Sequence, residues 1–461
     1  MRIDLFHLGA LELPAPRWGL GRVWPVLNQP RAIAEATAGR QEADAFLFWD
    51  ATLGAPEEAR VLEAMNVPGD VWHAGLVLGM GGQPCMIDFV DPVWRFNRDP
   101  EPGTIATSWR LSLRACLARA AVLNRLGGPD PHFESVTGAS LELGHRWIRR
   151  GAMMWHTANF LPDAAPDESP VELSLFDQIR FLRLRYGRVW AGWAGWRYWR
   201  RHGKAGDVIR ALRRPHASGV VAPAAFLHEL AADRQPMMAD FRPAVSILIP
   251  TLDRYPHLFN LLDQLRDQTV PPLEIIVVDQ TGRTVHDTEW PERFSDLPLR
   301  IIRRDEAGQC TSRNAGLRQA RGEAVLFLDD DDEVPPDLIA RHLEFLARFD
   351  VDASCGTAEE AGAGALPPEF SIIRNSDVFP TNNSLLKMAA LSGSGLFDLA
   401  YEKGERADHD LGMRLYLSGA SMALNPSASV IHLHAPRGGL RQHKARVITR
   451  SSSRASIRHR Q

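Results

Sequence analysis

The sequence predicts an α/β fold made of two related modules, each with a mostly parallel sheet, joined by a helical linker. Three observations predict it: β-branched runs alternate with helical segments after residue 244, part of that half matches the first half without a gap, and a basic, tryptophan-rich stretch separates them. With 461 residues the chain can form more than one hydrophobic core. We expect modules over 1–165 and 241–440, a linker over 166–240 and a basic flexible tail over 441–461.

The composition excludes several classes of protein. With 45% hydrophobic and 24% charged residues, the chain resembles ordinary globular proteins rather than disordered ones. A net charge of -3 gives no overall attraction to nucleic acid, so we expect no nucleic-acid partner. No run of eighteen apolar residues occurs, no secretory signal is recognisable, and the four cysteines form no CxxC pair. We therefore expect a cytoplasmic protein.

The strands of the second module are AVSILIP, EIIVVD, LRIIRR and AVLFL, and helical segments such as PHLFNLLDQLRDQ lie between them. Continuously apolar strands of this kind are buried on both faces of a sheet. Right-handed crossovers bring their carboxyl ends to one edge, where open α/β sheets bind ligands. Thr251, Asp253 and Asp279 follow two of these strands and Asp329–Asp332 follow a third. We therefore predict the binding site at this edge.

The two halves of the chain share an internal repeat. Residues 384–420 align with residues 116–152 without a gap. The identical pairs include Gly395 with Gly127, Asp398 with Asp130, Glu402 with Glu134, Leu411 with Leu143, Arg414 with Arg146 and Gly419 with Gly151. A match of this density predicts a duplicated module. In the first copy Ser140 replaces Asp408, so we expect that copy to be non-catalytic.

The four aspartates Asp329–Asp332 at the end of a buried strand are the most informative feature. Such carboxylates repel one another unless a cation is present, and oxygen ligands suit Mg²⁺ or Mn²⁺. These ions complete their shells with water and substrate phosphates, which points to a diphosphate ligand. The alternative, an acidic loop that caps the helix after Pro335, explains one aspartate but not four.

A basic stretch with regularly spaced tryptophans lies between the modules. Trp190, Trp193, Trp196 and Trp199 recur every third residue among the many arginines of residues 180–214. A tryptophan stripe with a basic opposite face is the composition of a helix in an anionic membrane interface, so residues 180–214 could contact a membrane peripherally. The alternative is a helix that packs its tryptophans onto a neighbouring domain.

Five segments together resemble the family 2 glycosyltransferases, which have the GT-A fold. They are VSILIPTLDR, EIIVVDQTG, GQCTSRNAGLRQARGEAVLFLDDDD, GLFD and ADHDLGMRLYLSGA, within residues 243–436. The first half then resembles a degenerate, partial copy of the same module. The resemblance implies an inverting, metal-dependent transfer of sugar from a UDP-, GDP- or dTDP-sugar to a glycan or lipid-linked acceptor. Such enzymes often build cell-surface polysaccharide, which implies a place at the inner face of the plasma membrane.

The resemblance also assigns roles to individual residues. The nucleotide sugar would be bound by Thr251, Asp253, Asp279, Arg313, Asp329 and Asp330. Asp329 and Asp331 match the DxD motif as metal ligands, and His432 or His434 would complete the Mg²⁺ or Mn²⁺ shell. Asp408 matches the general base of the ED-x-D-L motif, although Ala407 stands where relatives often have Glu. An ordinary first-turn aspartate of a surface helix is the alternative for Asp408.

Two other functions remain open from the sequence. A sugar nucleotidyltransferase shares a similar fold, but it is expected to have a glycine-rich loop after the first strand, where this chain has PTLDRYPH. A non-catalytic scaffold protein that binds nucleotide sugars or glycans would need neither Asp331 nor Asp408. The presence of both acids favours an enzyme.

Overall fold

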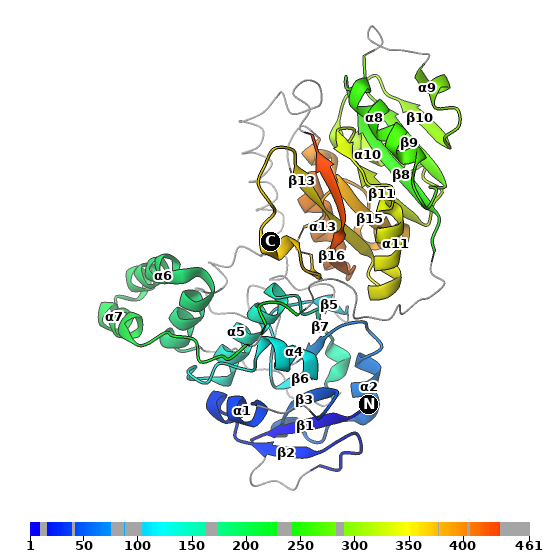
Figure 1. Cartoon of the computed structure of the whole chain (residues 1–461). Coiled ribbons are helices and arrows are strands. Elements are labelled where there is room, and N and C mark those ends of the chain that lie inside the picture. The colour runs from blue at the N-terminus through cyan, green and yellow to red at the C-terminus, as the bar shows by residue number, and fades with distance from the viewer. Residues whose placement is uncertain are drawn as a thin grey trace. The chain divides into compact units, whose positions relative to one another are not determined.

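The computed structural model describes residues 1–9, 16–38, 42–74, 87, 104–162, 173–222, 224–227, 242–282, 290–376, 378–402 and 406–433. The chain forms two compact units, Met1–His228 and Glu229–Gln461 (Figure 1). Each unit contains a β-sheet with helices on its faces, so the predicted α/β class with two sheets is confirmed. None of the helices in these ranges is both long enough and apolar enough to cross a membrane.

The first unit is built on a seven-stranded sheet in the order β2-β1-β3-β6-β4-β7-β5. Its strands are β1 (Ile3–Leu8), β2 (Val23–Val26), β3 (Ala45–Asp50), β4 (Val71–Ala74), β5 (Ala106–Thr107), β6 (Ala115–Arg119) and β7 (Met154–His156). The short helices are α1 (Pro30–Thr37), η1 (Ala51–Leu53), α2 (Glu58–Ala64), α4 (Ala120–Leu126) and η4 (Ala158–Phe160). The longer α5 (Val136–Arg149) is buried along most of its length.

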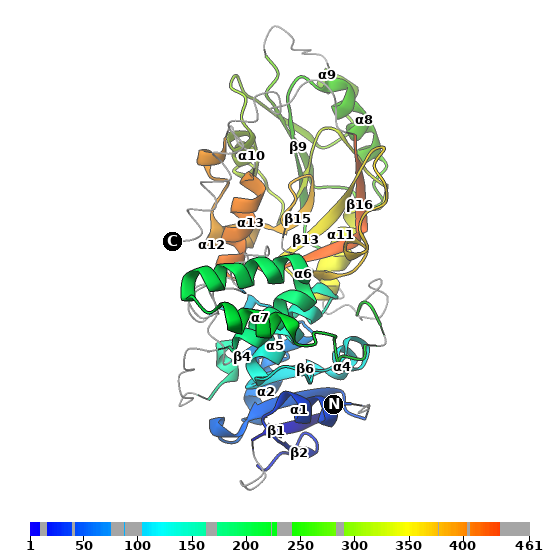
Figure 2. The ribbon, with the colours of Figure 1, turned by 90° about the vertical axis from the view of Figure 1, so that its left-hand side faces the viewer.

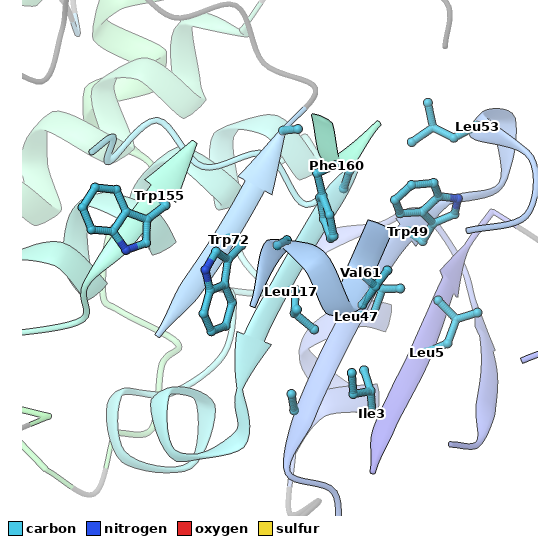
Figure 3. Packing of buried hydrophobic residues seen from close by; sticks show 14 residues of the cluster. Ile3, Leu5, Leu47, Trp49, Leu53, Val61, Trp72, Leu117, Trp155 and Phe160 are labelled. Atoms are coloured by element: carbon cyan, nitrogen blue, oxygen red, sulfur yellow. The ribbon is translucent and has the colours of Figure 1, made fainter. Parts of the chain in front are cut away.

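Large aromatic side chains form the core on one face of this sheet (Figure 3). Trp49, Trp72, Trp155 and Phe160 lie there with aliphatic residues of β1, β3 and β6. The side chains of Phe6, Phe46 and Phe48 alternate with these along the strands and are buried as well. Both faces of the sheet are therefore covered, although its first strand, IDLFHL, contains the buried polar residues Asp4 and His7.

The second unit contains a nine-stranded sheet with the path β10-β9-β8-β11-β15-β13-β16-β12, and β14 pairs with β16. The strands are β8 (Val245–Thr251), β9 (Glu274–Asp279), β10 (Leu299–Arg303), β11 (Ala324–Leu328), β12 (Asp332–Glu333), β13 (Ala353–Glu360), β14 (Arg374–Asn375), β15 (Asn383–Lys387) and β16 (Met422–His432). The helices are α8 (Tyr255–Arg266), α9 (Trp290–Arg293), α10 (Gln309–Leu317), α11 (Leu338–Phe349), α12 (Leu391–Ser394) and α13 (Ala407–Leu417). Short 3-10 turns η6 (Pro368–Phe370), η7 (Met388–Ala390) and η8 (Leu399–Tyr401) complete the described part.

The two sheets share one topology. The path β2-β1-β3-β6-β4-β7 runs parallel, parallel, antiparallel, antiparallel and parallel, and β9-β8-β11-β15-β13-β16 follows the same order. Both sheets are thus mixed rather than mostly parallel. The sequence could not reveal this, because strands buried on both faces are apolar whatever their direction.

The internal repeat is also present in the hydrogen bonds of the two units. Arg146 on α5 pairs with Glu142 at 3.1 Å and donates to the carbonyl of Leu126, whereas Arg414 on α13 pairs with Asp410 and donates to the carbonyl of Ser394. These residues are the equivalents given by the ungapped alignment. Gly127 and Gly395 both follow a short helix with φ near +75°, at 78° and 72°. These matching details support the duplication.

Replacement of Arg146 by methionine is expected to destabilise the first unit by about 3–5 kcal/mol. The change leaves buried Glu142 with only its 3.5 Å pair to Arg185 and removes donors from the carbonyls of residues 126–128. Urea unfolding followed by tryptophan fluorescence would measure this, because every tryptophan except Trp290 lies in the first unit. Arg31→Met, in an exposed pair with Glu35, is the control, and an equal shift in both variants would contradict the prediction.

The basic stretch forms the helices α6 (Leu175–His202) and α7 (Ala205–Arg213). Asp177 of α6 accepts hydrogen bonds from the backbone N–H groups of Glu134 and Ser135, and Arg180 forms a 2.7 Å ion pair with Asp130. Both helices therefore belong to the first unit, as Figures 1 and 2 also show. A linker over 166–240 stays a prediction, but its helical part is packed rather than free-standing.

Candidate functional site

The carboxyl ends of β8, β9 and β11 lie side by side and bring the predicted site residues to one edge of the sheet. Thr251 at the end of β8 pairs with Asp279 at the end of β9, and β11 lies parallel to the other side of β8. The acidic run follows β11 directly. This is the edge at which the sequence predicts ligand binding.

A buried ion pair fixes the middle of the acidic run. Asp330 accepts a hydrogen bond of 2.7 Å from the Thr251 hydroxyl and pairs with Arg254 at 3.2 Å. The same guanidinium nitrogen lies 3.1 Å from Asp331. All of these side chains are less than one-tenth exposed. Thr251 and Asp330 thus lie at the same edge of the sheet, as predicted. They contact each other, and Asp330 also contacts Arg254, for which no role was predicted.

The outer aspartates have partners as well. Arg313 on α10 donates to Asp329 at 2.9 Å, and His432 Nδ1 lies 3.0 Å from Asp332 and 3.8 Å from Asp331. His432 reaches this position because β16 is antiparallel to β12, so that Asp332 and His432 are register partners. The antiparallel pairing therefore completes the cluster.

The carboxylates of Asp329–Asp332 also have cationic partners within the protein. Two guanidinium groups and one imidazole lie against these carboxylates and offset much of the negative charge. Burial nevertheless raises the pKa of Asp330 to about 6, although Thr251 and Arg254 favour its charged form. Burial likewise raises the pKa of Asp332, and the hydrogen bond with Asp332 raises that of His432. The four carboxylates thus outnumber the two guanidinium groups and the one imidazole that lie against them.

One oxygen each of Asp329 and Asp331 and a ring nitrogen of His432 lie within 4.8 Å of one another. Three ligand atoms at such spacing fit around one divalent ion, and two carboxylates leave positions for water and phosphate. The imidazole favours a transition metal such as Mn²⁺ over Mg²⁺. These residues therefore fit the predicted cofactor. His434 lies outside the described residues.

A second group of contacts surrounds Asp279. It accepts hydrogen bonds from the Tyr255 hydroxyl at 2.9 Å and the Thr281 backbone N–H at 3.1 Å. Burial raises the pKa of Tyr255 to about 12, so the phenol remains a donor. Asp253 donates its backbone N–H to the Thr281 hydroxyl and has φ of 56°, a left-handed conformation found often at functional sites. Asp253 and Asp279 thus flank Thr281.

Gln280, which follows Asp279 at the end of β9, accepts a 2.6 Å hydrogen bond from the backbone N–H of Gly308. This contact ties the end of β9 to the residue before α10, the helix that carries Arg313. The Gln280 side chain therefore helps to hold the carboxyl end of β9 beside the start of α10.

Asp408 lies in the first turn of α13, where its side chain is about 30% exposed and 3.1 Å from His409 Nδ1. Phe397, ahead of this helix, exchanges two hydrogen bonds with the Asn314 side chain on α10. Glu402 accepts hydrogen bonds from the backbone N–H groups of Cys310 and Thr311 at the start of α10. The segment that leads to Asp408 is thus fastened to the helix of Arg313.

Sequence reasoning missed Arg254, Tyr255 and Glu402. Arg254 follows Asp253 directly, but its partner Asp330 lies 76 residues further along the chain, so no local pattern pointed to this ion pair. Glu402 has its equivalent in Glu134, which bonds Ser174 and Arg214 instead. No local pattern distinguishes these two environments.

The corresponding edge of the first unit has a different chemistry. Asp50 accepts hydrogen bonds from the N–H and hydroxyl of Thr52 and so caps η1. Ser140, the counterpart of Asp408, is buried and donates to the carbonyl of Val136. Glu142 is a buried ion-pair partner and not a surface acid. Among the described residues, ligand atoms suited to a metal gather only in the second unit.

Residues 246–388 match the family model described as "Glycosyl transferase family 2". The chain is 32% identical over 127 residues to the uncharacterized glycosyltransferase YwdF of Bacillus subtilis, which covers 27% of this chain and 47% of the relative. It is 23% identical over 185 residues to the poly(ribitol-phosphate) beta-N-acetylglucosaminyltransferase TarS of Staphylococcus aureus, over 38% of this chain and 32% of TarS. The chain thus spans less than half the length of these relatives.

Solved structures with a similar fold include a mannosyltransferase of Pyrobaculum calidifontis in complex with GDP-Man and Mn²⁺. It is 21% identical, with a TM-score of 0.37, and the match covers 57% of this chain and 70% of that one. Residues 1–349 of TarS in complex with UDP match with 21% identity and a TM-score of 0.36, over 42% of this chain and 61% of that one.

Proposed function

Because residues 246–388 carry a glycosyltransferase family 2 domain, we propose that this protein is an inverting, metal-dependent glycosyltransferase. It takes a sugar from a nucleoside-diphosphate donor and transfers it to a glycan or lipid-linked acceptor in cell-surface polysaccharide synthesis. The observation that carries the proposal is the cluster of Asp329, Asp331 and His432, whose ligand atoms lie within 4.8 Å at the edge where the parallel strands end.

In this proposal Asp329, Asp331 and His432 hold Mn²⁺ or Mg²⁺, to which His434 is a further candidate ligand. The ion, when bound, stabilises the negative charge that develops on the departing diphosphate. Thr251, Asp253 and Asp279 bind the base and ribose, whereas Asp330 orients the ribose or sugar. Arg313, 2.9 Å from Asp329, joins the donor pocket.

Asp408 is the proposed general base. Inversion at the anomeric carbon requires an acceptor hydroxyl to attack opposite the leaving diphosphate, and a carboxylate must take the proton as the bond forms. Asp408 is partly exposed in the first turn of α13, where the helix N-terminus favours its charged form. An incoming acceptor can therefore reach it.

The donor is a UDP-, GDP- or dTDP-sugar in this proposal, since TarS and the mannosyltransferase are in complex with UDP and GDP-Man respectively. TarS is named for transfer to poly(ribitol-phosphate), which supports a cell-surface polymer as the acceptor. We propose that the enzyme works in the cytoplasm, at the inner face of the plasma membrane. A lipid-linked acceptor would be present there.

A donor screen tests the proposal. One of the UDP-, GDP- or dTDP-sugars is expected to raise the melting temperature only when Mn²⁺ or Mg²⁺ is added, because a ligand at 100 times its Kd stabilises by about 2.7 kcal/mol. The same sugar should release nucleoside diphosphate in the presence of acceptor. Release of pyrophosphate from a nucleoside triphosphate would instead identify a nucleotidyltransferase. If no donor stabilises the protein, with or without metal, the result would contradict the enzyme proposal and favour a non-catalytic scaffold.

A further inference from the structure

The helices α6 and α7 form a hairpin, and we call the exposed side chains of residues 188–214 its outward face. Gly203, with φ of 70°, ends α6 and allows the chain to turn into α7. Small residues of α6 face α7: a Cβ added at Gly195 would lie 2.8 Å from Val208, and Ala191 and Ala194 are buried. Val208 of α7 is buried in this contact, and Figures 1 and 2 show the two helices side by side.

The outward face carries an unusual number of exposed hydrophobic side chains. Trp190, Trp196 and Trp199 are between 44% and 50% exposed, Val189 is 83% exposed and Ile209 is 49% exposed. Elsewhere in the described residues, exposed large hydrophobic side chains are scattered singly or in pairs. A concentration of this kind marks an interaction site rather than ordinary surface.

The same face is strongly basic. Residues 188–214 contain eight basic residues, all exposed, and the single acid Asp207, which gives a net charge of +7. The basic residues are Arg188, Arg197, Arg200, Arg201, Lys204, Arg210, Arg213 and Arg214. Within the described residues, Arg210 pairs with Asp207 and Arg214 pairs with Glu134. The face is therefore complementary to an anionic partner.

The sequence led us to expect tryptophans on one face of a helix and basic residues on the opposite face. In the structure, arginine and tryptophan side chains are instead interleaved. The guanidinium of Arg197 lies 5.1 Å from the ring centre of Trp193, and that of Arg200 lies 5.8 Å from that of Trp196. Trp190, Trp196 and Trp199 are about half exposed, and their packing onto a neighbouring domain stays the alternative prediction. Mixed aromatic and basic side chains are typical of the lipid headgroup region.

We propose that the outward face of the α6–α7 hairpin binds the surface of an anionic phospholipid bilayer. The tryptophans, Val189 and Ile209 enter the boundary between headgroups and acyl chains, and the arginines contact lipid phosphates. Nucleic acid would match the charge and the aromatic rings, but it offers no apolar environment for Val189 and Ile209. This inference rests on the proposed function in one respect: membrane binding would bring the enzyme to a lipid-linked acceptor. Binding to lipid does not itself require sugar transfer, so the two can be tested separately.

Vesicle sedimentation of the full chain tests this proposal. Binding is expected to vesicles of phosphatidylcholine with 30% phosphatidylglycerol and not to phosphatidylcholine alone, and 0.5 M NaCl should weaken it. A triple change R197Q/R200Q/R201Q should lower the partition coefficient on the order of 100-fold, because each basic residue near an anionic surface contributes about fivefold. A double change W196S/W199S should lower it at least tenfold.

The matched control is the double change R31Q/L62A, which removes one exposed basic and one exposed hydrophobic residue elsewhere on the first unit and should leave binding unchanged. Unaltered urea midpoints show that the hairpin variants are folded. Absence of wild-type binding, equal loss in the control, or binding of an RNA oligonucleotide in place of vesicles would overturn the proposal. Vesicle binding without sugar transfer would overturn the proposed function alone, and transfer to a soluble acceptor without vesicle binding would overturn this inference alone.

Discussion

Asp408→Asn is expected to lower the rate of sugar transfer by roughly 10²–10⁴-fold and to leave donor affinity within about twofold of wild type. The amide keeps the size of the side chain and can still contact His409, which lies 3.1 Å away, but it cannot take the acceptor proton. Release of nucleoside diphosphate under saturating donor and metal would measure the rate, and thermal stabilisation by the donor would measure binding.

A matched control separates loss of a base from loss of a helix-terminal charge. Glu292 is an exposed acid in the first turn of α9, so Glu292→Gln removes the same kind of charge from another helix of the second unit. This variant should transfer sugar at the wild-type rate. If Asp408→Asn lowers the rate no more than Glu292→Gln does, Asp408 is an ordinary first-turn residue and the base lies elsewhere.

Asp331→Asn is expected to weaken Mn²⁺ binding and to lower transfer by roughly 10²–10³-fold at metal concentrations that saturate the wild type. A neutral amide removes the charge that attracts the ion, and without the ion the charge on the leaving diphosphate loses the stabilisation that a divalent cation would supply. Titration of Mn²⁺ into metal-free protein, followed by thermal denaturation, measures affinity without turnover. Chelation of the wild type by EDTA should have the same effect on rate.

The first unit provides the control for this metal prediction. Asp50 ends β3 as the acidic run follows β11, but it caps η1 and has no second carboxylate beside it that matches Asp331. Asp50→Asn should therefore change neither metal affinity nor transfer. Unchanged Mn²⁺ dependence in the Asp331 variant would show that this carboxylate is no ligand and would remove the metal site as proposed.

Much of this architecture could be predicted from the sequence. Apolar strands that end in Thr251, Asp279 and Asp329 predicted an α/β unit with polar groups at one sheet edge, because parallel strands end together. The ungapped repeat predicted that Arg146 and Arg414 are equivalent, and both pair with an acid four residues earlier. Both predictions succeeded because they depend on the spacing of apolar residues and on residue identities, which can be read directly from the sequence.

Contacts between distant segments could not be predicted in this way. The position of His432 beside Asp332 depends on an antiparallel strand pair that spans 100 residues. The pairing of Arg254 with Asp330 depends on two loops that meet only in the folded sheet. The break in α6 at Gly187, where φ is 86° and ψ is -176°, likewise has no local signal that distinguishes this glycine from Gly192 and Gly195. Three-dimensional structure was required for each.

The pairing of Arg254 and Arg313 with the acidic run bears on the shape of the site after the product of the proposed reaction has left. In the proposed reaction, after the nucleoside diphosphate and its metal ion had dissociated, the carboxylates would still have cationic partners, because Arg254 and Arg313 lie 3.2 Å or less from three of them. The vacated pocket can then keep its shape while it waits for the next donor.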